Sequence, residues 1–194
     1  MASHPDPALP AGTMEIQLIP NDTRLRAFTA GMADNTFHLI DTQQGTATAV
    51  FNFDSFAIQG APVWPQLLRL NQAGTRLFIT LNYAGAAGKV VMFDSTRPEQ
   101  PEVLSTVDLG PNSGPHYLRL TQDEKRLVVT DYFLVEDLAP GGIVHAEGDH
   151  KIHVINVNSN RLERDTRFDL DFNRDIGTGP ARPHGVALLP VTDN

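Results

Sequence analysis

Two histidines stand in matching contexts that suit metal binding. His116 and His184 each directly follow a proline, and in the repeat described below Gln66 takes the same place. Neutral imidazole is the commonest nitrogen ligand and suits copper, zinc or iron. Zinc or copper normally takes at least three protein ligands, so these two would need partners from elsewhere in the assembly. The alternative is that both side chains only hydrogen-bond backbone groups at the start of a strand.

A second histidine group lies between residues 145 and 153. It contains His145, His150 and His153 together with Glu147 and Asp149. The spacing matches no metal motif, so the favoured interpretation is a solvated insertion with a polar tip. Another histidine, at position 38, alternates with apolar neighbours on an expected strand and is predicted to be outward-facing or hydrogen-bonded.

Three further side chains could line a ligand site. Trp64 precedes an expected strand and could stack on a ligand, although packing is the simpler role. Arg69 and Arg119 alternate with leucines at equivalent places and could attract an anion into a channel. Ion pairs with Asp94 or Asp131 are the favoured alternative for the two arginines.

These residues belong to a repeat of about fifty residues. The segments LRLNQAGTRLFIT (68–80) and LRLTQDEKRLVVT (118–130) are identical at seven of thirteen positions, and IQLIPNDTRLRAFT (16–29) is a fainter copy if Arg24 is set against Arg76. Each copy begins with alternating apolar and polar residues, continues with a cluster of turn residues, and ends in a run of β-prone residues. This order predicts a hairpin. Two further alternating segments complete each copy.

Four antiparallel strands per repeat of this length predict an all-β fold built from β-propeller blades. We expect a flexible tail at 1–13, blades at 14–60, 61–113 and 114–181, and a closing strand at 183–190. An ordinary β-sandwich would not explain the near-identical copy. Propellers usually have four to eight blades, so three blades imply either a larger ring or a homo-oligomer that closes one.

Composition narrows the function classes. The chain has 194 residues, no cysteine and a formal net charge of −8, with 41% hydrophobic residues. This predicts one globular domain, or one piece of a larger one, without disulfides, thiolate nucleophiles or iron–sulfur clusters. Its charge disfavours nucleic acid and anionic membranes as partners. The absence of a long apolar run and of a signal-peptide pattern predicts no membrane span and a cytoplasmic location, with the periplasm as the alternative.

The last two repeats resemble a known family. GPHYLRLTQDEKRLVVT (114–130), a long insertion, and RFDLDFNRDIGTGPARPHGVALLP (167–190) resemble the last blade of the selenium-binding protein family, which includes methanethiol oxidases. KVVMFDSTRPEQPEVLSTVDLG (89–110) resembles that family's penultimate blade. The most telling match is Gly179-Pro180 followed by His184.

The resemblance implies a seven-bladed propeller that binds selenium or copper. Some members oxidise methanethiol to formaldehyde, hydrogen sulfide and hydrogen peroxide. It therefore implies copper or another transition metal at His116 and His184 and a small thiol as substrate. The repeat pattern itself makes Trp64, Gln66 and Arg119 the candidates to line the ligand site. The family's N-terminal half, with a cysteine motif and further histidines, has no counterpart in this sequence.

Two alternatives come from other classes. One is a non-catalytic propeller scaffold that binds a protein or small-molecule partner. The other is a lactonase-like hydrolase with calcium on the propeller axis, which is disfavoured because calcium prefers carboxylate oxygens and the equivalent positions here offer Gln and His.

Overall fold

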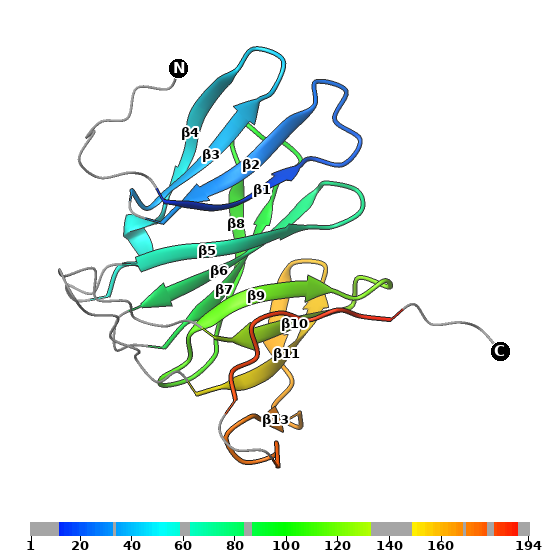
Figure 1. The fold of residues 1–194 in the computed structure, drawn as a ribbon. Coiled ribbons are helices and arrows are strands. Elements are labelled where there is room, and N and C mark those ends of the chain that lie inside the picture. The colour runs from blue at the N-terminus through cyan, green and yellow to red at the C-terminus, as the bar shows by residue number, and fades with distance from the viewer. Residues whose placement is uncertain are drawn as a thin grey trace.

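Three antiparallel sheets follow one another along the chain, the first two with four strands and the third with five (Figure 1). The computed structural model describes residues 12–32, 34–58, 63–83, 87–132, 149–168, 170–177 and 181–189. The first sheet contains β1 (Thr13–Leu18), β2 (Arg26–Gly31), β3 (Thr36–Asp41) and β4 (Thr46–Asn52), followed by the 3₁₀ turn η1 (Phe53–Phe56). The second contains β5 (Val63–Leu70), β6 (Arg76–Tyr83), β7 (Lys89–Asp94) and β8 (Glu102–Asp108). The third contains β9 (Pro115–Leu120), β10 (Arg126–Asp131), β11 (Lys151–Asn158) and β12 (Arg161–Arg164), with the short β13 (Leu170–Asp171) pairing with β11.

The predicted all-β class and the four-stranded repeating unit are confirmed. Within each sheet the first four strands pair in sequence order, and every pairing is antiparallel. The second and third sheets lie inside the predicted ranges 61–113 and 114–181, and the first sheet begins one residue before the predicted range 14–60. β1 begins at Thr13, and residues 1–11 of the predicted tail lie outside the described residues.

The alignment of the first repeat was wrong by two residues. Arg26, not Arg24, is the equivalent of Arg76, because Arg26 pairs with Asp41 as Arg76 pairs with Asp94 at the start of the second strand. The turn before Arg26 is two residues longer than in the other repeats. In that turn the Asp22 carboxylate lies 2.6 Å from Nε of Arg26.

Apolar side chains fill the two spaces between neighbouring sheets. Phe37, Phe53 and Phe93 belong to an aromatic cluster between the first and second sheets. Met92, the neighbour of Phe93 on β7, points the other way and packs with Leu127 and other residues between the second and third sheets. Because side chains alternate along β7, the second sheet contributes to both apolar cores. This is the face-to-face packing of successive propeller blades.

Polar contacts tie the inner strands to one another. The first strands of the three sheets, β1, β5 and β9, lie side by side (Figure 1). The Leu68 N–H donates to Oε2 of Glu15 at 3.1 Å, which joins β5 to β1. The Thr80 hydroxyl on β6 donates to the His116 carbonyl at 2.8 Å, which joins the second blade to β9.

Residues 181–189 repeat this last contact without forming a regular strand. The Thr130 hydroxyl donates to the His184 carbonyl at 3.1 Å, as Thr80 does to His116. His184 therefore stands where the inner strand of a following blade would begin. The structure assigns coil, not β-strand, to this part of the predicted closing strand (red in Figure 1).

Within the described ranges, none of the helical segments has the length and apolar character needed to cross a membrane.

Candidate functional site

The structure brings His116 and His184 together. Their ring centroids lie 5.0 Å apart, and the ring planes are 21° from parallel. Tyr132, the residue after β10, completes the cluster, with its ring 4.3 Å from that of His184 and 5.7 Å from that of His116. β9 positions His116, and the Thr130 hydroxyl anchors the backbone that carries His184.

The two histidines differ in exposure to solvent. His116 is buried, with 7% of its surface exposed, whereas His184 is exposed. Burial, and then the nearby His184 ring, lower the pKa of His116 to about 4. A buried neutral imidazole is the form that binds a metal ion, so His116 meets that requirement at neutral pH.

The pair fits a shared transition metal only in part. Imidazole lone pairs lie in the ring plane, and stacked rings aim them side by side rather than at one point. Convergence on one ion requires the His184 ring to turn, which its exposure permits. Two imidazoles are also fewer than the three or more protein ligands of usual zinc or copper sites.

The predicted ligand-lining residues do not form one site. Gln66 is fully buried, and its side-chain amide donates weakly to the Trp64 carbonyl at 3.4 Å. Register confirms that Gln66 and His116 are equivalent, since the preceding prolines pair with Leu81 and Asp131 of the second strands. Trp64 is half-buried.

Arg119 lines a groove near the other end of the inner strands. The groove has a volume of about 550 Å³ and includes Arg69, Arg119 and Leu188 in its lining. Arg69 lies 3.6 Å from Glu15 and over the ring of Tyr117. Arg69 therefore forms an inter-blade ion pair, as predicted, but its partner is Glu15. The predicted partners are engaged elsewhere, because Asp94 pairs with Arg76 and Asp131 faces His153.

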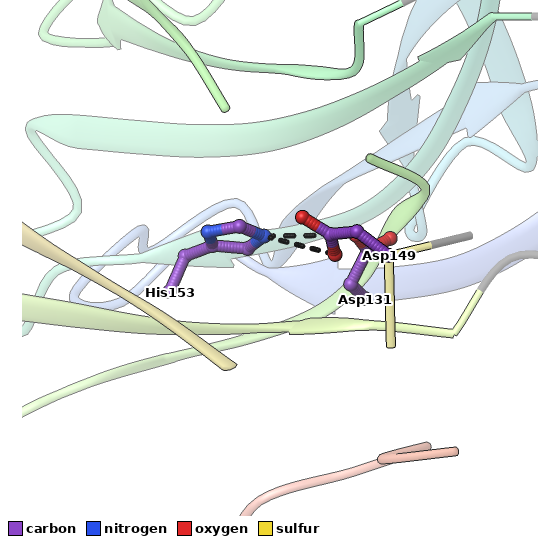
Figure 2. Close-up of side chains that lie close together, drawn as sticks. All are labelled: Asp131, Asp149 and His153. Carbon is purple, nitrogen blue, oxygen red and sulfur yellow. Dashed lines mark ion pairs between the residues drawn. The ribbon is translucent and has the colours of Figure 1, made fainter. Parts of the chain in front are cut away.

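A second polar cluster lies in the third blade. His153 on β11 points at Asp131, the last residue of β10, and at Asp149, just before β11 (Figure 2). Nε2 of His153 lies 3.6 Å from Oδ2 of Asp131 and 3.5 Å from Oδ1 of Asp149. The side chains of His153 and Asp131 are 1% and 0% exposed, and that of Asp149 is 16% exposed.

Burial and charge shift the pKa values of the three groups in this cluster in different directions. Burial raises the pKa of Asp131 to about 7. Burial opposes the shifts of the other two groups, but the contact with His153 holds the pKa of Asp149 below its usual value, and the two carboxylates raise the pKa of His153. Two carboxyl groups and one imidazole thus lie together in one largely buried space.

Sequence reasoning missed most of this second cluster. The solvated interpretation is wrong for His153 and His150, which are 2% and 6% exposed. Pairing of His153 with Val129 turns the imidazole toward the core face, as strand alternation with buried Ile155 indicates. His145, Glu147 and Gly179-Pro180 lie outside the described residues.

Two other outcomes concern single side chains. His38 is hydrogen-bonded as predicted, with Nε2 3.1 Å from Asp34. Tyr132 was not foreseen beside the histidines. The only indication in the sequence was that Tyr132 directly follows Asp131 at the end of a strand. Neighbouring side chains of a strand point to opposite faces.

Comparison with solved structures shows the fold. A hypothetical selenium-binding protein from Sulfolobus tokodaii superposes with a TM-score of 0.63 at 19% identity, over 88% of this chain and 42% of that one. The Pseudomonas aeruginosa periplasmic gluconolactonase superposes with a TM-score of 0.56 at 12% sequence identity, over 83% of this chain and 39% of that one. A β-propeller domain from Myceliophteria thermophila superposes with a TM-score of 0.50 at 14% sequence identity, over 81% of this chain and 47% of that one.

These relatives, together with the three repeated sheets, define the chain as a set of β-propeller blades. The chain spans less than half the length of each of these three structures. No family model matches the sequence, and no curated protein matches it either.

Proposed function

We propose that these blades belong to a selenium-binding-protein-like propeller that holds a transition metal, copper in the first instance, at His116 and His184 and oxidises a small thiol such as methanethiol. The observation that carries the proposal is the meeting of the two histidines, 68 positions apart in the sequence, with ring centroids 5.0 Å apart. The likeness of fold to the Sulfolobus tokodaii protein supports the same assignment.

The chain's own residues have distinct roles in this proposal. His116 offers a neutral nitrogen on an inner strand, and Tyr132 packs against the exposed His184 ring. A bound copper ion would supply one-electron chemistry toward dioxygen that side chains lack. Further ligands would come from other blades of the ring or from a second copy of the chain.

Copper binding tests the site directly. The purified chain is titrated with Cu²⁺ and followed by electron paramagnetic resonance, in which directly bound imidazole nitrogens split the signal. We expect His116→Gln and His184→Gln each to weaken binding by about tenfold or more. His38→Gln is the matched control, because His38 lies beside Asp34 in the first blade. Equal copper binding in all four proteins would refute the site.

Thiol turnover tests the activity. The copper-loaded chain is given methanethiol in an oxygen electrode, with peroxide and remaining thiol measured in parallel. Because the sequence has no cysteine, the loss of free thiol reports the substrate alone. Oxygen uptake that depends on thiol, copper and His116 supports an oxidase. A copper-loaded protein that binds metal at the histidines but consumes no oxygen favours the non-catalytic scaffold.

A further inference from the structure

The second cluster, in the third blade, has the geometry of a metal site. We propose that Asp131, Asp149 and His153 bind one divalent metal ion, Zn²⁺ in the first instance, at a site separate from the His116–His184 pair. The three side chains come from the end of β10, the residues before β11, and β11 itself, and their potential ligand atoms all lie within 4.8 Å of one another (Figure 2).

The distances suit a shared ion better than direct hydrogen bonds. Separations of 3.5 and 3.6 Å from Nε2 of His153 to the two carboxylates are too long for strong hydrogen bonds. Zinc lies about 2.0–2.2 Å from nitrogen and oxygen ligands, so two ligands at a tetrahedral angle are about 3.4 Å apart. An ion could therefore enter between these atoms with small side-chain movements.

Burial leaves two ligand atoms without a hydrogen bond. Oδ2 of Asp131 and Nε2 of His153 are buried and have no hydrogen-bond partner among the residues that the structure describes, and their side chains are 0% and 1% exposed. Buried polar atoms in native proteins are nearly always satisfied, because leaving them bare costs free energy. A cation at the meeting point would satisfy both atoms and neutralise the two acids.

Backbone hydrogen bonds hold both acidic residues in place. The Gly114 N–H donates to Oδ1 of Asp131, which leaves Oδ2 aimed at the cluster. The Lys151 N–H donates to Oδ1 of Asp149 at 3.2 Å, and the Asp149 N–H donates to the Asn112 carbonyl at 2.8 Å. Such outer contacts orient ligands before an ion binds, as in established metal sites.

The donor set selects the kind of ion. One imidazole nitrogen and two carboxylate oxygens match zinc, whereas calcium and magnesium prefer oxygen ligands alone. Three protein ligands leave at least one position for water. Because Asp131 ends β10 and Asp149 precedes β11, the ion would clamp the two ends of the long connection between these strands.

The two proposed metal sites use different side chains. Asp131 belongs to the second cluster, whereas the next residue, Tyr132, packs on His184. Because the two sites share no ligand, loss of one site need not remove the other.

The test is a zinc titration of the chelator-treated chain by calorimetry, with thermal unfolding measured in parallel. We expect wild type to bind zinc and to unfold at a higher temperature with zinc than without. Asp149→Asn and His153→Gln should lower zinc affinity by about 100-fold or more, beyond the usual effect of an outer-contact change. Both variants should lose the zinc-dependent rise in unfolding temperature.

Controls separate this site from folding defects and from the histidine pair. Asp54→Asn makes the same change at an exposed acid and should bind zinc as wild type does. His116→Gln should also retain the zinc response, which distinguishes failure of this site from failure of the proposed oxidase site. Asp131→Asn keeps an acceptor for Gly114, so its metal-free form should fold while its zinc affinity falls. Wild type without zinc binding, or cluster variants that bind as wild type does, would overturn the inference.

Discussion

The two sites depend on single side chains whose roles are set by burial. His116 and Gln66 occupy the same place in two blades, and both are buried, yet only His116 has a titratable side chain. Burial and the neighbouring His184 lower the pKa of His116 to about 4. The cost of charging this imidazole is therefore linked to folding.

This linkage predicts acid sensitivity. The unfolded chain protonates His116 near pH 6.5, whereas the folded chain does so only near pH 4. Between these values the unfolded state binds more protons, so stability falls as the pH falls from about 6.5 to 4, by on the order of 2–3 kcal/mol. Denaturant unfolding of metal-free protein across this range measures it. His116→Gln, which copies the second blade, should lose less stability, and an identical pH profile would contradict the assignment.

Close backbone approach positions the strand that carries His116. Gly88 precedes β7, and its N–H donates to the Ser113 hydroxyl at 2.9 Å just before β9. A Cβ at Gly88 would lie 2.0 Å from Cδ of Pro115 and 2.9 Å from the Ser113 carbonyl oxygen. The junction between the second and third blades therefore has no room for a methyl group.

Gly88→Ala should accordingly destabilise the fold by about 1–3 kcal/mol, the usual cost of overpacking. It should also weaken copper binding, because Pro115 and His116 must shift together. Gly177→Ala is the control, since a Cβ there meets no atom of the described residues within 4 Å. Guanidinium unfolding of the three proteins measures the effect, and equal stability of Gly88→Ala and wild type would show that the junction is loose.

On the scale of the whole molecule, and within the part of the chain that the structure describes, one face of the first blade has no blade packed on it. Met14, Ile16 and Leu18 alternate along β1 and are 44%, 60% and 60% exposed, whereas Glu15 and Gln17 on the other face bond to β5. In a closed ring an inner strand has a blade on both sides. A second copy of the chain would supply the missing neighbour and close the open edge.

We therefore expect the purified chain to self-associate, with a mass near twice 21.2 kDa by light scattering coupled to size exclusion. Ile16→Lys should shift the protein toward monomer, because a charge on this face opposes burial. Val103→Lys, at a 41% exposed apolar residue on the outer strand β8, is the matched control. A monomer at every concentration would contradict association through β1.

The sequence alone determined the class of the fold and the repeating unit. The near-identical segments at 68–80 and 118–130 and the alternation along each strand predicted four-stranded blades, because these patterns are local. The shared place of Gln66 and His116 also followed from the repeat. The misplaced Arg24 shows the limit, since a turn two residues longer cannot be seen where the copy is faint.

Only the tertiary structure decided which side chains meet. Asp131, Asp149 and His153 converge because β10 pairs with β11 in one register, and that register also turns His153 inward. The same packing made His116 buried and left His184 exposed, although both follow a proline. Burial, and with it each pKa, depends on atoms from distant segments that no local pattern specifies.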